Sequence, residues 1–235
     1  MSNSNGNIVQ LTYAMVSEYM ASFDSSHDMH HVNRVVDLAL HIAKDSIQRK
    51  ACDVDLQVVE LAALCHDVGD RKYYKGNETG GQLIEKFLRE HDYEKASLVA
   101  KIVDHIGFSK ELGWNDTTDP KDEVEWRNSC LELHAVQDAD KLDAIGAFGI
   151  MRCAAFSGAK NIPLYVPNEN GAVENLTKEI YETKKNSSSI AHFHEKLFKL
   201  KTMMRTERGK ELAIQRDNFM QLFVKQINDE YNLLS

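Results

Sequence analysis

Proline is scarce in this chain of 235 residues, which contains only Pro120, Pro163 and Pro167. The first 119 residues therefore lack the residue type that most strongly interrupts a helix. No run of strands, internal repeat, low-complexity tract or domain linker stands out either. The sequence therefore predicts an all-α fold in a single domain.

Paired cysteines and long apolar runs are also missing. No Cys-x-x-Cys pair occurs, and no apolar stretch reaches the roughly 18 residues that a transmembrane helix needs. The polar start MSNSNGN lacks the apolar segment of a secretory signal. These absences favour a cytoplasmic, or also nuclear, protein without disulfides and without a membrane partner. The four cysteines are Cys52, Cys65, Cys130 and Cys153.

The chain has no excess of positive charge. Its 28 basic and 36 acidic side chains give a net charge of −8, and proteins that grip long nucleic acid usually show a basic footprint. A small substrate is the better prediction. A phosphorylated one needs local positive charge, from a metal ion or a few placed Lys and Arg, against the overall sign.

Apolar residues at helical spacing fill most of the chain. We predict a tail over residues 1–7, a core over 8–177, and C-terminal helices over 178–235 that pack on the core. Loops are expected over 70–77 and 107–122, and an irregular segment over 158–177. The predicted helices are 8–23, 30–47, one from Asp53 or Asp55 to Gly69, 78–90, 92–106, 123–157 with a break near Gly146 or Gly149 left open, 178–207 and 209–233.

Several polar side chains fall where a helix should be buried. His66 and Asp67 end an almost wholly apolar helix, and burying them is costly unless they are paired or metal-bound. Asp140 lies in a helix of small residues, which allows another helix to approach closely. His31 borders the apolar stripe of its own helix. Two imidazoles and two carboxylates in a helical core make a site for a divalent cation.

Each of these residues also has a structural interpretation. A lone histidine beside an apolar stripe is often a hydrogen-bonded core residue, and an aspartate inside a helix often pairs with a lysine. His-Asp pairs also occur by chance, and this chain has three of them, at His27, His66 and His91. Spacing alone therefore leaves the metal site open.

Three motifs make the pattern specific. They are HDMHHVNRVVDLAL from His27, LAALCHDVGDRKY from Leu61, and AVQDADKLDAIGAFGIMR from Ala135. Together they resemble the HD superfamily of metal-dependent phosphohydrolases. The nearest resemblance is to a bacterial subfamily that includes deoxynucleoside triphosphate pyrophosphohydrolases, with motifs H-x-x-R-V, H-D-I-G-D and D-A-D-R-L-D-A-I-G-A. The resemblance covers residues 27–165, whereas 178–235 carry no recognised motif and the loop 107–122 looks longer than in bacterial members.

The resemblance implies a helical HD-domain bundle around one divalent ion. Its ligands would be His31, His66, Asp67 and Asp140. Asp138 competes for the last position, but it lies about 200° around the helix from Asp140, so only one of the two can face the metal. Mn²⁺ is the ion we expect first, with Co²⁺, Fe²⁺, Zn²⁺ and Mg²⁺ as alternatives.

The catalytic candidates are Asp70, as a proton acceptor, and Lys72, as a charge that neutralises phosphate. Candidates for substrate binding are Arg34, Lys141 and His105. Each candidate also has a simpler interpretation. Asp70 can be an ordinary loop residue, His105 a structural histidine, and the lysine and arginine side chains solvated surface charges.

The predicted function is hydrolysis of a phosphate ester or anhydride bond in a small nucleotide. The subfamily resemblance implies cleavage of a nucleoside triphosphate to monophosphate and pyrophosphate. The alternatives are a phosphatase acting on nucleoside 5′-monophosphates and a catalytically silent helical module that binds nucleotides or a protein partner. The sequence leaves open whether the chain forms a homodimer.

A zinc protease is a further alternative, because the segment HDMHH from His27 to His31 resembles the protease motif H-E-x-x-H. His27 is expected at or before the helix start, which would prevent the two histidines from sharing one helix face. A protease is therefore a poor interpretation.

Overall fold

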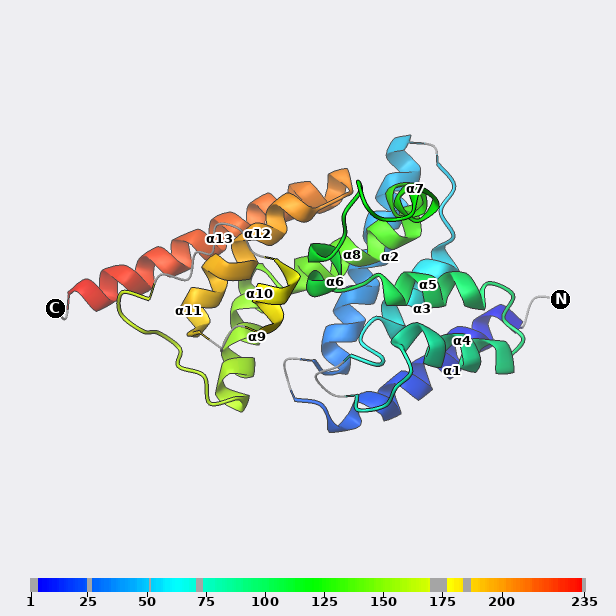
Figure 1. Ribbon diagram of the computed structural model, residues 1–235, viewed down its shortest axis with the longest axis horizontal. Coiled ribbons are helices and arrows are strands. Elements are labelled where there is room, and N and C mark those ends of the chain that lie inside the picture. Colours follow the sequence, from blue (N-terminus) through cyan, green and yellow to red (C-terminus); the bar gives the residue numbers. More distant parts are fainter. Residues whose placement is uncertain are drawn as a thin grey trace.

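Helices make up all the regular secondary structure of the described residues, which are 4–24, 27–50, 52–70, 74–169, 177–183 and 187–233. Figure 1 shows the computed structural model. The prediction of an all-α fold is confirmed. The main helices are α1 (Ser4–Tyr19), α2 (Met29–Lys50), α3 (Leu56–Cys65), α4 (Gly80–Glu90), α5 (Ala96–Asp104), α6 (Phe108–Leu112), α7 (Lys121–Ser129), α8 (Leu131–Asp143), α9 (Gly146–Ala159), α10 (Lys178–Thr183) and α13 (Glu207–Asn232).

The centre of the molecule is formed by α2 and α8, which pack along each other (Figure 1). On one side α3 packs against both, and it also contacts α1 and α5. Because its sequence LQVVELAALC is apolar nearly all round, α3 is buried over most of its length. Asp55 caps it by accepting hydrogen bonds from the backbone amides of Gln57 and Val58.

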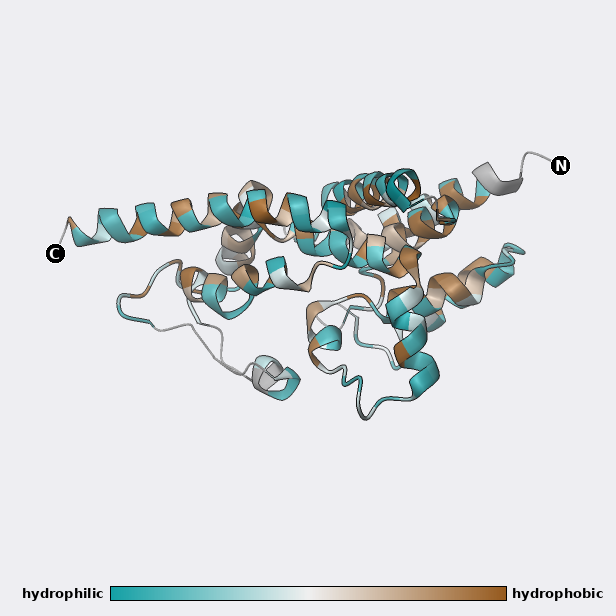
Figure 2. Cartoon of the chain, turned by 90° about the horizontal axis from the view of Figure 1, so that it is seen from above, coloured by the Kyte–Doolittle hydropathy of each residue, from teal (hydrophilic) through white to brown (hydrophobic). Residues whose placement is uncertain are grey.

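On the other side, α9 and α13 pack together, and α13 also contacts α2 and α8. Figure 2 shows α13 as bands of hydrophilic and hydrophobic residues along its length, the pattern of a helix that packs on one face. Ala213, Met220 and Val224 are its buried apolar residues.

The sequence prediction differs from the structure in several helix bounds, and three of the differences alter a predicted tail, a predicted loop and the interior of a predicted helix. First, α1 begins at Ser4, so residues 4–7 are helical rather than part of a tail. Second, the predicted loop 107–122 contains the short helix α6. Third, the predicted helix 178–207 is interrupted: α10 ends at Thr183, and a later helical run over 189–203 includes a π-helical turn at Phe193–Leu197.

The predicted long helix 123–157 is three helices. The break at Gly146 was anticipated: Ile145 is extended and Gly146 has φ +76°, a value that favours glycine. The break at Cys130 was not. There the backbone is extended, and the buried Arg127 on α7 pairs with Asp116 and Asp119 of the preceding loop, which holds α7 to that loop.

In the described part of the chain, no single helix is both long and apolar enough to cross a membrane. One pair of these helices, α8 and α9, is long and apolar enough when taken together, but the two helices meet at a bend of 67°.

The first turn of α13 is held by a carboxylate from α8. Asp138 is fully buried and accepts hydrogen bonds from the backbone amides of Arg205 and Thr206, at 2.9 and 2.8 Å, and from the Thr206 hydroxyl at 2.7 Å. Thr206 in turn caps α13 by accepting from Gly209. Asp138 thereby ties the C-terminal helix to the centre of the fold.

Asp138→Ala should therefore lower the free energy of unfolding by about 2–4 kcal/mol, because it leaves buried backbone donors without an acceptor. Urea denaturation measures this. The matched control is Asp229→Ala, whose carboxylate makes an exposed ion pair with Lys225 and should contribute less than about 1 kcal/mol. Equal effects of the two substitutions would contradict the assignment.

Candidate metal centre

Four polar side chains from three helical segments converge beside the centre of the fold. His31 lies in the first turn of α2, His66 and Asp67 directly follow α3, and Asp140 lies in the last turn of α8. The Asp28 carboxylate accepts from the His31 backbone amide at 3.0 Å and so fixes the start of α2. Two of the helices, α2 and α3, each pack against α8, which brings the four residues together.

The ligand atoms lie at distances that suit one ion. The Nε2 atoms of His31 and His66 are 3.1 Å apart, and each is 3.4 Å from Asp67 Oδ2. Asp140 Oδ1 lies 4.0 Å from the first nitrogen and 3.8 Å from the second. Atoms that bind one cation at about 2.0–2.2 Å are themselves separated by about 3.0–4.2 Å. All four predicted ligands therefore occupy one site.

The hydrogen bonds of the two imidazoles leave both Nε2 atoms free to bind a cation. His31 Nδ1 faces the Asp143 carboxylate at 2.7 Å, and His66 Nδ1 faces the Ala63 carbonyl at 2.8 Å. Because both oxygens can only accept, each Nδ1 carries the proton, an assignment made from the partners. The two Nε2 lone pairs then point toward each other. A cation between them, or an added proton, is needed to relieve the repulsion.

A buried carboxylate oxygen supports the same conclusion. Asp67 Oδ2 is buried and has no hydrogen-bond partner among the described residues. Such an atom is costly unless a ligand satisfies it. The two imidazoles and the Asp67 carboxylate, with its unsatisfied oxygen, could hold a divalent metal ion, and Asp140 borders this group.

Without a cation, the neighbouring charged groups shift the pKa values of the side chains in the site. Burial lowers the pKa of His66, but the carboxylates of Asp67 and Asp140 outweigh burial and raise that pKa to about 9. Burial likewise raises the pKa of Asp67, but His66 and His31 hold it well below its ordinary value. The metal-free site therefore keeps a proton on His66, and a metal ion must displace it.

The two aspartates of the Asp-Ala-Asp run face different parts of the molecule. Asp140 faces the histidines, whereas Asp138 faces the start of α13 and is satisfied there. Their separation around α8 agrees with the sequence expectation that only one of them can face the metal.

Sequence reasoning missed the role of Asp143. It is fully buried and accepts from His31, from Arg34 at 2.7 and 3.0 Å, and from Arg152 at 3.1 Å. Burial acts to raise the pKa of Asp143, but His31 and Arg34 hold it far below its usual value. Asp143 shares a helix face with Asp140, three residues away, and that spacing was the available signal.

The predicted proton acceptor, Asp70, lies in the turn that follows the ligand pair. Its backbone amide donates to the Asp67 carbonyl at 3.3 Å, and Gly69 beside it adopts φ +76°. Lys72 lies outside the described residues. Tyr19, which sequence reasoning missed, accepts from the Gly69 amide at 3.1 Å. Burial, together with the nearby charges of Asp70 and Asp67, raises the pKa of Tyr19.

Two other predicted residues are engaged elsewhere. Lys141 is buried, pairs with Glu111 at 2.8 Å and donates to the Met203 carbonyl. His105 contacts Glu123 through Nε2 at 2.7 Å and the Lys101 carbonyl through Nδ1. In the described part of the chain, neither of them forms a hydrogen bond or ion pair with the four ligands.

His27 precedes α2, which begins at Met29, so the HDMHH segment does not place two histidines on one helix face. Its ring lies edge-on to His31 and to Phe156, at 6.0 and 6.4 Å between ring centroids. The protease interpretation has no support in this geometry.

Metal binding should tighten as the pH rises. The raised pKa of His66 means that its proton stabilises the metal-free fold below about pH 6.5, and that this stabilisation is lost as the pH rises through about 9. The same rise removes the proton that competes with metal. Saturating metal should therefore raise the melting temperature more at pH 8.5 than at pH 6.5, measured by scanning fluorimetry against a chelated sample. An equal shift at both pH values, or the same pH dependence in His66→Ala, would contradict this.

Comparison with known proteins agrees with the geometry. Residues 29–145, which contain all four ligands, match the HD domain family. The chain is 36% identical over 220 residues to the uncharacterized protein YpgQ of Bacillus subtilis, covering 92% of this chain and 89% of that protein.

Solved structures are similar over nearly the whole chain. A structure from Lactobacillus plantarum has 30% identity and a TM-score of 0.76, covering 99% of each chain. The structure of Bacillus subtilis YpgQ in complex with ADP has 30% identity and a TM-score of 0.67, covering 94% of this chain and 97% of that one. An HD-superfamily hydrolase from Bacillus thuringiensis has 28% identity and a TM-score of 0.67, covering 97% and 98%. With residues 29–145 matching the HD domain and a relative 36% identical over 92% of the chain, this protein belongs to the HD domain family.

Proposed function

We propose that this protein is a metal-dependent phosphohydrolase that cleaves nucleoside triphosphates to monophosphate and pyrophosphate. The observation that carries the proposal is the pair of Nε2 atoms of His31 and His66, which lie 3.1 Å apart and are flanked by Asp67 and Asp140. The proton of each ring is on Nδ1, the nitrogen that faces away from this pair. Support for a nucleotide substrate comes from the ADP bound to the relative YpgQ. The choice of triphosphate follows the sequence resemblance of the three motifs.

The chemistry that a divalent cation supplies at such a centre is Lewis acidity toward a phosphoryl oxygen and a lowered pKa for water. His31, His66, Asp67 and Asp140 would hold the ion. Their charges sum to −2 when both imidazoles are neutral, which balances one divalent cation and leaves the substrate's own charge to be met elsewhere.

The protein's remaining contribution is to orient groups and accept a proton. Asp143 keeps the His31 ring in the orientation and tautomer that present Nε2 to the ion. Asp70, in the turn after Asp67, is the proposed acceptor for the proton of the attacking water. Arg34, held on Asp143 within one turn of His31, is the proposed phosphate contact. Water oxygen would bond to the α-phosphorus as the bond to the bridging oxygen breaks, and pyrophosphate leaves.

The direct test is to incubate purified protein with nucleoside tri-, di- and monophosphates and each candidate metal, and to measure phosphate and pyrophosphate separately. We expect one equivalent of pyrophosphate per triphosphate and little inorganic phosphate from any substrate. Inorganic phosphate from monophosphates would instead indicate a nucleotidase. Metal and nucleotide binding without turnover would indicate a silent module, and either result would overturn the proposal.

Asp70→Asn and Asp140→Asn should separate catalysis from metal binding. The first should lower kcat by about 10²-fold or more while the metal content stays near that of the wild type, because it removes only the proton acceptor. Asp140→Asn should lower both kcat and the metal content, because it replaces a proposed carboxylate ligand with a weaker amide ligand. Metal content is measured by elemental analysis beside initial rates, with His105→Gln as the control. Loss of metal in Asp70→Asn would refute its assignment as the proton acceptor.

A further inference from the structure

Three arginines from three helices surround the carboxylate that orients His31. Arg34 on α2 and Arg152 on α9 both donate to Asp143. Arg216 on α13 donates to the Leu142 carbonyl beside it, and the charge of Asp143 acts on Arg216 as well. We refer to Arg34, Arg152 and Arg216 as the arginine cluster.

Arg216 is the member whose charge is least compensated. It is partly buried, and its hydrogen-bond acceptor is a backbone carbonyl; in the described part of the chain it forms no ion pair with a carboxylate. Burial lowers its pKa, which Asp143 only partly offsets. A guanidinium held away from water without a carboxylate is costly on its own and favours binding of an anion.

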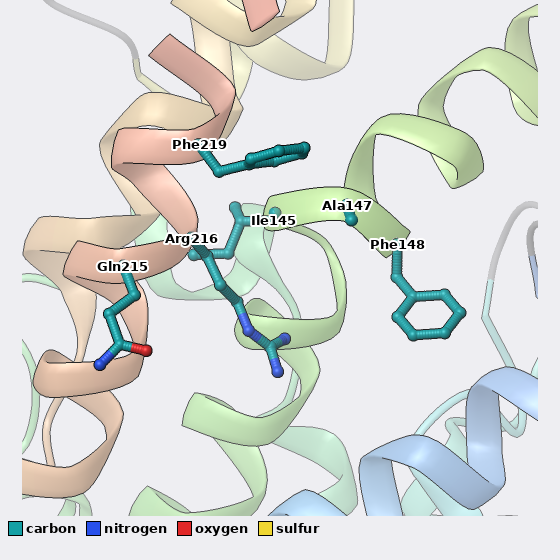
Figure 3. Close-up of a pocket in the computed structure, with 7 residues that line it drawn as sticks. Ile145, Ala147, Phe148, Gln215, Arg216 and Phe219 are labelled. Atoms are coloured by element: carbon teal, nitrogen blue, oxygen red, sulfur yellow. The ribbon is translucent and has the colours of Figure 1, made fainter. Parts of the chain in front are cut away.

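Arg216 lines a hollow between the start of α9 and the side of α13 (Figure 3). The hollow has a volume of about 280 Å³. Arg216 runs from α13 beneath the turn that joins α8 to α9, and Phe148 projects from the first turn of α9. The Arg34 guanidinium lies over the Phe148 ring, 4.4 Å from its centroid, which holds the guanidinium plane in place. The lining residues are Ile145, Gly146, Ala147, Phe148, Gln215, Arg216 and Phe219.

Glycine at position 146 is needed for this arrangement. Its φ of +76° is a conformation that other residues rarely adopt, and a Cβ there would lie 2.9 Å from Cγ of Arg216. The turn between α8 and α9 therefore leaves room for the Arg216 side chain to pass beneath it.

The arginine cluster lies on the far side of one imidazole from the metal centre. His31 presents Nε2 to the centre and Nδ1 to Asp143, so an ion at the centre would lie roughly 7 Å from the carboxylate that holds the arginines. A polyphosphate chain can span such a separation. Guanidinium groups bind phosphate oxygens through paired hydrogen bonds.

We propose that the arginine cluster binds the pyrophosphate portion of a nucleoside triphosphate whose α-phosphate lies at the metal centre. This inference rests on the proposed function and deepens it. It explains how a chain with net charge −8 attracts a polyanion, and it gives α13 a part in substrate binding through Arg216. Nucleoside triphosphates should then bind more tightly than monophosphates.

The test is calorimetric titration of inorganic pyrophosphate, and separately of a nucleoside monophosphate, into metal-loaded protein. Arg216→Gln and Arg152→Gln should each weaken pyrophosphate binding about tenfold and change monophosphate binding less than about twofold. Arg216→Lys keeps the charge and should recover part of the affinity, which separates charge from folding. The matched control is Arg49→Gln, an arginine at the other end of α2 that pairs with Asp45 and Glu211.

Wild-type pyrophosphate affinity in both glutamine variants, or equal losses for pyrophosphate and monophosphate, would overturn the proposal. Loss of pyrophosphate binding in Arg49→Gln would do the same. The readout does not depend on turnover. If pyrophosphate binding depends on the arginines but triphosphates are not hydrolysed, the proposed function is contradicted and the pyrophosphate site is supported. If triphosphates are hydrolysed at rates that the arginine substitutions do not change, the pyrophosphate site is contradicted and the proposed function is supported.

Discussion

Two imidazole nitrogens facing each other across 3.1 Å, both with their protons fixed on the opposite side, are the constraint on which the site depends. Two carboxylates complete the enclosure, and one of their oxygens is buried without a hydrogen-bond partner among the described residues. Such an arrangement is unfavourable while both imidazoles are neutral, because lone pairs and negative charge meet in a poorly solvated space; without a metal ion, a proton on His66 relieves it. A divalent cation turns each of these repulsions into an attraction.

The fold provides this arrangement mainly through α8. Four of its side chains reach four different parts of the molecule: Asp138 binds the start of α13, Asp140 faces the metal centre, Lys141 pairs with Glu111 on α6, and Asp143 orients His31. Because all four are on one rigid helix, the position of the candidate ligand Asp140 is coupled to the packing of the C-terminal helix and of α6. This accounts for the three charged residues Asp138, Lys141 and Asp143 that are buried on α8.

The sequence predicted the helices and the ligands for different reasons. The apolar periodicity of α2 and α3 was strong enough to place His31 and His66 at buried helix ends, and the three motifs then predicted four ligands whose side chains lie close together in the structure. Periodicity did not predict the break at Cys130, where α7 ends and its residue Arg127 pairs with Asp116 and Asp119 of the preceding loop. A tertiary ion pair of this kind leaves no periodic signal.

The partners of the charged residues around the site could not be predicted from the sequence either. Lys141 and His105 have residue types that suit phosphate binding, yet they pair with Glu111 and Glu123, acids that are distant in the sequence. The spacing of Asp143 from Asp140 was a signal in the sequence, but nothing indicated that Arg152 donates to Asp143, because the two residues meet across the turn at Gly146. Residue type predicted which chemistry is available, whereas the turns and ion pairs determine which residues reach the centre.

The most direct measurement is an anomalous difference map from crystals of the manganese-loaded protein. The account predicts one strong peak between His31 Nε2 and His66 Nε2, within about 2.0–2.3 Å of both nitrogens and of an oxygen from each of Asp67 and Asp140. A peak at another place, or a peak that lacks either imidazole among its ligands, would contradict it.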